Sequence, residues 1–365
     1  MDILDYFEFE DAGRRLEDLE TPVPVIDIGI VAHNLRRWQQ RCDAAGFANR
    51  PHIKTHKLAA LAKAQIGMGA RGITVQKLGE AEVMAEAGIT DMLLTFNVVG
   101  RPKLARLAEL ARRTDIKLVA DNDVVLDGLA HAAQRAGRDI AVMVECDTGG
   151  ARNGVQSPEA AVVLAKEIDR RQGLAFGGLM TLPKNGARAR MAEFLDAARD
   201  KLATAGLDVP EVSTGGSPDM WQDEGLTHIS EYRAGTYIYC DRMQMAAGSA
   251  TPDDCAFTVL STVVSVPTAE RAMLDAGSKA LTCDLMGLDG YGEVRALSGA
   301  LVYAMSEEHG FLDISKVNDK PKVGDVLRIT PNHVCPVSNL FDKVVFVKGG
   351  DVLGAVKVNA RGTVQ

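Results

Sequence analysis

The feature that most constrains the fold is an alternation of short β-branched runs with longer amphipathic stretches, between about residues 22 and 240. A strand that is followed by a helix and another strand needs a crossover connection, so this order predicts a parallel sheet. About eight such units fit a closed, TIM-like (β/α)8 barrel better than an open doubly wound sheet, which is the alternative architecture. The predicted strands are residues 24–28, 50–54, 73–76, 92–96, 117–121, 140–147, 176–182 and 212–216.

The alternation stops near residue 251. Beyond that point strand-like runs follow one another with turns between them, and no convincing helical stretch separates them. Consecutive strands without crossover helices predict an antiparallel β domain. We therefore predict a barrel domain over residues 22–245 and a C-terminal β domain over residues 251–365, on which residues 1–21 could pack.

Composition excludes several classes of protein. Of the 365 residues 46% are hydrophobic and 25% charged, which is typical of a globular protein with a sizeable core. The net charge of -8 argues against a nucleic-acid or membrane-surface binder. The six cysteines show no CxxC spacing, so no disulfide framework is expected. Because the chain also lacks a secretory signal pattern and a long apolar run, we expect a cytoplasmic protein.

The segment RPHIKTHK contains a candidate catalytic lysine, Lys54. On a strand, His52 and Lys54 would project from the same face. Lys54 would then lie at the carboxyl end of a barrel strand, where barrel enzymes assemble their chemistry. A partly desolvated amine in that position can form a Schiff base with a carbonyl compound. A solvated basic turn is the alternative interpretation of the same residues.

Two glycine-rich turns follow later strands. VECDTGGARNGV places Arg152 just beyond a strand end, where a guanidinium can bind a phenolate or a carboxylate with fixed geometry. In VSTGGSPDM, glycines would let backbone N–H groups approach an anion closely, as phosphate sites after late barrel strands do. This second turn consists of Thr214, Gly215, Gly216 and Ser217. Either segment could also be an ordinary surface turn.

The segment ITPNHVCPVSN contains a candidate metal-binding pair. If it is a strand, His333 and Cys335 project from one face and converge on one point. Imidazole nitrogen and thiolate suit zinc and can accept other divalent ions, and two protein ligands leave positions open for substrate. A core cysteine beside a surface histidine is the alternative.

Seven segments occur in a characteristic order: RPHIKTHK, DTGGARNG, STGGS, EYRAGTY, LDAGSKA, SEEHG and PNHVCPVSN. Together they resemble the D-threonine aldolase and D-serine dehydratase family of alanine-racemase-like, fold-type III pyridoxal-phosphate enzymes. The resemblance implies a barrel that carries pyridoxal phosphate on Lys54, a β domain, a homodimer, and a divalent metal (Mn, Mg or Zn) at His333 and Cys335. The residues that we accordingly expect to contact the cofactor are Lys54, His52, Arg152, Thr214, Gly215, Gly216, Ser217, Gly235, Thr236 and Tyr237.

Two departures from the family pattern bear on the reaction. Leu182 stands where many relatives have a tyrosine, and no histidine follows shortly after it. Cys335 stands where several aldolases have aspartate, and dehydratase-like members have cysteine. Both departures favour dehydration, whereas the overall pattern, including YIYCDRM and LDAGSKAL, favours aldolases.

We therefore expect a lyase acting on a D-3-hydroxy amino acid. D-threonine aldolase is favoured, and D-serine or D-3-hydroxyaspartate dehydratase is the alternative. An amino-acid racemase is disfavoured by the His-x-Cys pair. A non-catalytic pyridoxal-phosphate carrier is disfavoured by the additional β domain.

Overall fold

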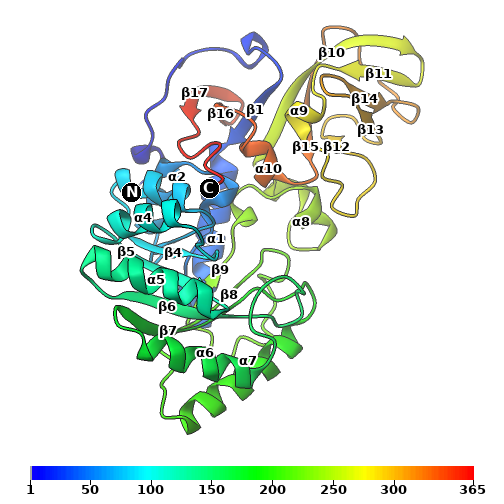
Figure 1. The fold of residues 1–365 in the computed structure, drawn as a ribbon. Helices are drawn as coiled ribbons and strands as arrows, with labels where there is room; N and C mark the ends of the chain where they lie inside the picture. Colours follow the sequence, from blue (N-terminus) through cyan, green and yellow to red (C-terminus); the bar gives the residue numbers. More distant parts are fainter. Residues whose placement is uncertain (1) are drawn as a thin grey trace. The chain divides into compact units, whose positions relative to one another are not determined.

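The computed structural model describes residues 2–365, which form two compact units (Figure 1). The barrel unit consists of Gln39–Lys54, Leu61–Gly235 and Thr363–Gln365. The β unit consists of the residues up to Trp38, Thr55–Ala60 and Thr236–Gly362. None of the helices in the described residues is both long and apolar enough to span a lipid bilayer.

The barrel unit contains eight strands in the order β2-β9-β8-β7-β6-β5-β4-β3, and every pairing between neighbours is parallel. The ends of this order also meet, because the Thr74 N–H donates to Pro51 O at 2.8 Å and His52 forms a bridge with Thr74. The predicted (β/α)8 barrel is therefore confirmed. Its strands are β2 (Ala48–Asn49), β3 (Ile73–Val75), β4 (Asp91–Leu94), β5 (Asp115–Ala120), β6 (Ile140–Cys146), β7 (Leu174–Thr181), β8 (Val212–Gly215) and β9 (Glu231–Arg233).

The first predicted barrel strand belongs to the other unit. β1 (Val23–Asp27) pairs antiparallel with β10 (Phe257–Thr268) and parallel with β16 (Lys343–Lys348). The eighth barrel strand is instead β9, whose three residues were too short a run to predict. Because the middle of β1 is buried on both faces, its apolar pattern suits either sheet. The barrel therefore does not begin at residue 22.

Helices lie between most successive barrel strands, but β8 is followed by β9 without one, and Figure 1 shows α4 to α7 along the outer side of the sheet. Local signals set several of their ends: the Asn122 side chain accepts from the Val125 N–H at the start of α5, and Gly137 closes that helix with a left-handed φ of 74°. The helices are α1 (Ile28–Ala45), α2 (Ala59–Gly67), α3 (Leu78–Glu86), α4 (Arg101–Ala111), α5 (Asp123–Ala136), α6 (Pro158–Arg170) and α7 (Arg188–Thr204).

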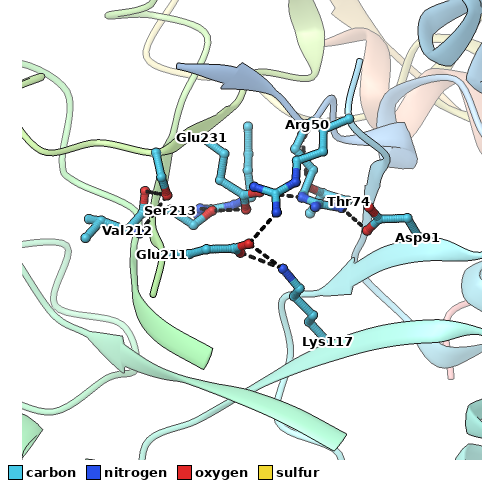
Figure 2. A network of polar contacts seen from close by, with 11 residues as sticks. Arg50, Thr74, Asp91, Lys117, Glu211, Val212, Ser213 and Glu231 are labelled. Carbon is cyan, nitrogen blue, oxygen red and sulfur yellow. Dashed lines mark hydrogen bonds and ion pairs between the residues drawn. The ribbon is translucent and has the colours of Figure 1, made fainter. Parts of the chain in front are cut away.

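A buried polar network lies near the end of the barrel where its strands begin (Figure 2). The fully buried guanidinium of Arg50 contacts Asp91 Oδ1 and Glu231 Oε2, both at 2.6 Å. Beside this cluster, Lys117 Nζ contacts Glu211 Oε1 at 2.6 Å. Barrel enzymes use the opposite, carboxyl end of the strands for chemistry, so this network serves stability.

The β unit is built on one sheet in the order β11-β14-β13-β12-β15-β10-β1-β16-β17, and a further β11–β10 pairing closes its first six strands into a ring. All neighbours in this sheet are antiparallel except β1 and β16, so the predicted antiparallel β domain is confirmed. The strands not yet given are β11 (Arg271–Leu274), β12 (Gly292–Val294), β13 (Leu301–Met305), β14 (Gly310–Asp313), β15 (Val326–Pro331) and β17 (Asp351–Lys357).

Three short helices also belong to the β unit: α8 (Arg242–Ala246), α9 (Ser278–Leu281) and α10 (Val334–Ser338). The expectation that no helix follows residue 251 was wrong for α9 and α10. Each has only four or five residues, about one turn, which is too short to show a helical period. Near the N-terminus, the rings of Phe7 and Phe9 pack against Phe346 of β16.

Candidate active site

Lys54 lies in a 3-10 turn, Ile53–Thr55, that follows the first barrel strand. The strand alternation on which we based the shared face of His52 and Lys54 therefore does not hold at these residues. The two are linked in another way, because the Lys54 backbone N–H donates to His52 Nδ1 over 3.5 Å. His52 Nε2 lies 3.0 Å from Gln76 Oε1, so the ring carries its proton on Nε2. Gln76, just after β3, was not identified from the sequence.

Arg152 lines a cavity of about 210 Å³ at the carboxyl ends of β6 and β7. Leu182, Lys184 and Glu145 line the same cavity. The Arg152 side chain is exposed, and its Nη2 lies 3.9 Å from Glu145 Oε1. Leu182 Cδ1 lies 3.8 Å from the position that a Cβ atom would take on Gly216. The segment that departs from the family pattern thus borders the predicted phosphate-binding turn.

Glu145 is a buried carboxyl group in this cavity that the sequence analysis missed. Burial raises its pKa to about 7, although the charge of Arg152 opposes this effect. Its Oε2 accepts a hydrogen bond of 2.7 Å from Asn153 Nδ2. The signal was a single acidic residue in the otherwise apolar run IAVMVEC. Glu145 can therefore gain or lose a proton near neutral pH beside Arg152.

The structure brings the predicted turn after β8 together with Gly235. Ser217 Oγ accepts a hydrogen bond of 3.2 Å from the Gly235 N–H. A Cβ atom on Gly215 would lie 2.7 Å from the carbonyl oxygen of Arg233, so glycine is required there. Gly216 has a φ of +116°, which disfavours any side chain. The turn offers closely approachable backbone, as the binding of an anionic group requires.

Three other predicted cofactor residues have different environments. Thr214 is buried, and its Oγ1 lies 3.1 Å from Met191 Sδ. Tyr237, in the β unit, is buried with its ring centroid 5.9 Å from that of Trp38. Thr236 Oγ1 lies 3.7 Å from Cys335 Sγ in the same unit. Their roles toward the cofactor stay predictions.

His333 and Cys335 lie at the start of a helix and not on a strand. His333 is the N-cap residue of α10, and Cys335 lies in its first turn. The strand alternation that we used to predict their convergence was therefore the wrong reason. The two side chains are near enough to interact, because the charge of Cys335 and a hydrogen bond between the pair both act to raise the pKa of His333.

Asp241 holds the other nitrogen of this imidazole. Its fully buried carboxylate has Oδ2 2.9 Å from His333 Nδ1 and accepts from the Val334 N–H at 3.0 Å. Burial acts to lower the pKa of His333, but Cys335 and Asp241 raise it to about 10. A metal ion on this imidazole would therefore displace a proton.

The donor set of His333 and Cys335 fits a divalent ion with open positions. An imidazole and a thiol are ligands that zinc accepts, and a carboxylate on the second imidazole nitrogen is the usual partner of a metal-binding histidine. Thr55 Oγ1 also lies 3.1 Å from Cys335 Sγ. Within residues 2–365 no group of three or more His, Cys, Asp or Glu side chains is arranged to hold a metal.

A (β/α)8 barrel combined with an antiparallel β unit defines the alanine-racemase-like class of proteins. Residues 26–243 match the family model described as "Alanine racemase, N-terminal domain", and residues 256–347 match that of a "Putative serine dehydratase domain". The chain belongs to this family, as the resemblance of its motifs predicted.

Similar proteins cover nearly the whole chain. A D-threonine aldolase from Arthrobacter sp is 33% identical over 364 residues, which cover 96% of this chain and 95% of that protein. A D-threo-3-hydroxyaspartate dehydratase from Delftia sp. is 33% identical over 355 residues, 88% of this chain and 93% of the relative. The crystal structure of a D-threonine aldolase from Filomicrobium marinum superposes with a TM-score of 0.91 at 31% identity, covering 98% of this chain and 100% of the other. These relatives are lyases.

Proposed function

We propose that this chain is a pyridoxal-phosphate- and divalent-metal-dependent lyase of D-3-hydroxy amino acids, and that it cleaves D-threonine to glycine and acetaldehyde. The observation that carries this proposal is the donor pair His333 and Cys335, with Asp241 on the second nitrogen of the imidazole. A racemase has no use for a metal that binds a substrate hydroxyl group. The similarity to an Arthrobacter D-threonine aldolase supports the same reaction.

Most of the residues that would hold pyridoxal phosphate are in the barrel unit, and Thr236 and Tyr237 are in the β unit. Lys54 would supply the amine, Arg152 the cation near the cofactor's phenolic oxygen, and the Gly216–Ser217 turn the backbone that receives the phosphate. The cofactor, when bound, supplies an electron sink for negative charge at the substrate's Cα atom. Lys54 is half-buried.

His333 and Cys335 would hold the metal, which supplies Lewis acidity at the substrate's 3-hydroxyl oxygen. For aldol cleavage, a base on the protein must take the proton of that hydroxyl while the Cα–Cβ bond breaks. For dehydration, Lys54 Nζ must take the Cα proton while hydroxide leaves from Cβ. The unsaturated amino acid that is released then takes up water and loses ammonia, which leaves a 2-oxo acid.

Dehydration is the second candidate, and the lining of the cavity beside Arg152 favours it. Leu182 takes the place of the family's tyrosine, and within the described residues no histidine lines that cavity. The histidine assigned as the base for the hydroxyl proton in aldolases has no counterpart in this lining, whereas dehydration needs only Lys54 as the base for the Cα proton. The similarity to a D-threo-3-hydroxyaspartate dehydratase supports this alternative.

The two reactions are separated by their products. Protein loaded with pyridoxal phosphate and Mn²⁺ is incubated with D-threonine, and acetaldehyde, 2-oxobutanoate and L-allo-threonine are measured separately. We expect acetaldehyde with an equal amount of glycine. Mainly 2-oxobutanoate and ammonia would establish the dehydratase, and mainly L-allo-threonine, the product of inversion at Cα alone, a racemase. No product from D-threonine, D-serine or D-3-hydroxyaspartate would refute the lyase and favour a cofactor carrier.

We also propose that the protein is a homodimer, as the family resemblance implies. One chain has a mass of 39.1 kDa. Light scattering on the eluting peak of a gel-filtration column is expected to give twice this mass, and a single-chain mass at micromolar concentration would contradict the dimer.

A further inference from the structure

We infer that Asp241 is a positioning residue for the metal site: its carboxylate fixes the proton of His333 on Nδ1 and so directs Nε2 to the metal. This inference rests on the proposed metal dependence and extends it to a residue outside the predicted ligand pair. Asp241 lies in YIYCDRM, 92 residues before His333 in the sequence.

Both carboxylate oxygens of Asp241 accept hydrogen bonds from neighbouring segments. Oδ2 lies 2.9 Å from His333 Nδ1 and accepts a hydrogen bond of 3.0 Å from the Val334 N–H. Oδ1 accepts a hydrogen bond of 2.9 Å from the Gln244 N–H and so caps α8. The side chain has no exposed surface, so it relies on these partners in place of water.

His333 is the partner that can carry positive charge. Its Nδ1 lies 2.9 Å from Asp241 Oδ2, which is within ion-pair distance. A buried carboxylate that is hydrogen-bonded to an imidazole nitrogen selects the tautomer protonated at that nitrogen. The remaining nitrogen then has a lone pair directed away from Asp241, which is what a metal ion needs.

Asp241 also fixes the backbone that leads to the second ligand. Oδ2 accepts a hydrogen bond from the backbone N–H of Val334, and Val334 is the residue between His333 and Cys335. Cys240, immediately before Asp241, has a φ of 50°, a strained conformation for a residue other than glycine. A tight turn therefore places Asp241 where one oxygen orients the imidazole and the start of α10 together.

A purely structural role, capping α8, is the alternative that the experiment must exclude. Asparagine could still cap α8 with its carbonyl oxygen, but its NH₂ group would then face the Val334 N–H and His333 Nδ1. The imidazole could accept from this NH₂ group only by moving its proton to Nε2, the position that the metal requires. Asp241→Asn therefore separates the cap from the choice of tautomer.

The test measures metal binding to the pyridoxal-phosphate-loaded protein. After treatment with EDTA and its removal, Mn²⁺ and Zn²⁺ are titrated calorimetrically into wild type, Asp241→Asn and a matched control, Asp254→Asn. Asp254 is also a buried carboxylate of the β unit, and its Oδ2 accepts from the Thr251 N–H at 2.7 Å. We expect the metal affinity to fall by about 10- to 100-fold in Asp241→Asn. It should stay within about twofold in Asp254→Asn, where no metal ligand is contacted.

The outcomes distinguish this inference from the proposed function. Wild-type affinity in Asp241→Asn would overturn the positioning role, whereas absence of metal binding by the wild type would overturn the proposed metal dependence itself. If Asp241→Asn does not fold, the metal-loaded wild type still provides a test through long-range ¹H–¹⁵N NMR of ¹⁵N-histidine. The resonances of His333, assigned by their loss in His333→Gln, should show the proton on Nδ1, and a proton on Nε2 would overturn the inference.

Discussion

The hydroxyl of Thr55 lies 3.1 Å from the sulfur of Cys335, although 280 residues separate them in the sequence. Thr55 directly follows Lys54, so adjacent residues carry the proposed cofactor amine and a hydrogen bond to the proposed metal ligand. A hydroxyl that donates to a thiolate stabilises its charged form, which is the form that binds metals.

Thr55→Val is therefore expected to weaken metal binding by about tenfold, the effect of removing one hydrogen bond to a charged acceptor. Thr55→Ser keeps the hydroxyl and should retain most of the affinity. The measurement is a competition titration against a chromogenic chelator on the cofactor-loaded protein. Equal affinities for the valine and serine variants would show that the contact has no effect on the metal site.

Lys54→Ala is expected to lose both the visible absorbance of bound pyridoxal phosphate and all lyase activity. The reason is that the Lys54 amine is the proposed partner of the cofactor's carbonyl carbon. Lys57→Met, which removes the second lysine of the same motif, should keep the absorbance. As a direct check, borohydride reduction followed by peptide mapping should find the cofactor on Lys54, and a label on another lysine would refute the assignment.

Chelation is expected to remove the lyase activity while the cofactor stays bound. The substrate hydroxyl needs a Lewis acid in either reaction, so EDTA should reduce product formation to background, and added Mn²⁺ should restore it. A solution of EDTA already saturated with Mn²⁺ is the control for effects of the chelator itself. Full turnover by protein shown to be metal-free by mass spectrometry would contradict the metal dependence.

The order of strands and helices was enough to predict the architecture of both units, because parallel and antiparallel sheets need different connections. The sheet to which β1 belongs could not be predicted in this way. Its central residues are apolar and buried, and such a run is compatible with either sheet. The register with β10 and β16 is set by residues more than 200 positions away.

The sequence analysis could propose Lys54 and the pair His333 and Cys335 because these residue types stand in short motifs, and their roles stay predictions. The groups that support these residues were not predictable. Asp241 contacts His333 across 92 residues, and Gln76 contacts His52 across 24 residues. Such partners depend on the packing of distant segments, which leaves no local pattern in the sequence.

Glu231→Ala is expected to lower the free energy of unfolding by about 3–5 kcal/mol, because it leaves the buried Arg50 guanidinium without its buried partner. The double variant Arg50→Met, Glu231→Leu should recover most of this loss, since it buries no charge at these two positions. Urea unfolding monitored by circular dichroism provides the free energies. A single variant as stable as wild type would show that the ion pair contributes nothing.

Because of the same ion pair, we expect the free energy of unfolding to depend on pH in the acidic range. Burial acts to raise the pKa of Glu231, but Arg50 and a hydrogen bond from Ser213 lower it below its usual value. A lowered folded-state pKa contributes stability above the unfolded pKa of about 4.3, and this contribution is lost as the pH falls through the folded pKa. The difference between wild type and Glu231→Gln should therefore shrink below about pH 4.

Glu145 should show the opposite dependence. Burial raises its pKa to about 7 from an ordinary value of 4.5, so the folded protein binds the proton more tightly than the unfolded chain does. The associated stability is fully present below about pH 4.5 and is lost as the pH rises through about 7.

Glu145→Gln cannot ionise, so its free energy of unfolding relative to wild type should rise by up to about 3 kcal/mol between pH 4.5 and pH 8. Urea unfolding of the cofactor-free proteins at several pH values measures this difference. Glu193→Gln, at an exposed position of α7, is the control and should give a difference that does not change with pH. A pH-independent difference for Glu145→Gln as well would mean that Glu145 remains ionised in the folded protein. It would then face Arg152 as a fixed negative charge, and it could not exchange a proton with a substrate near neutral pH.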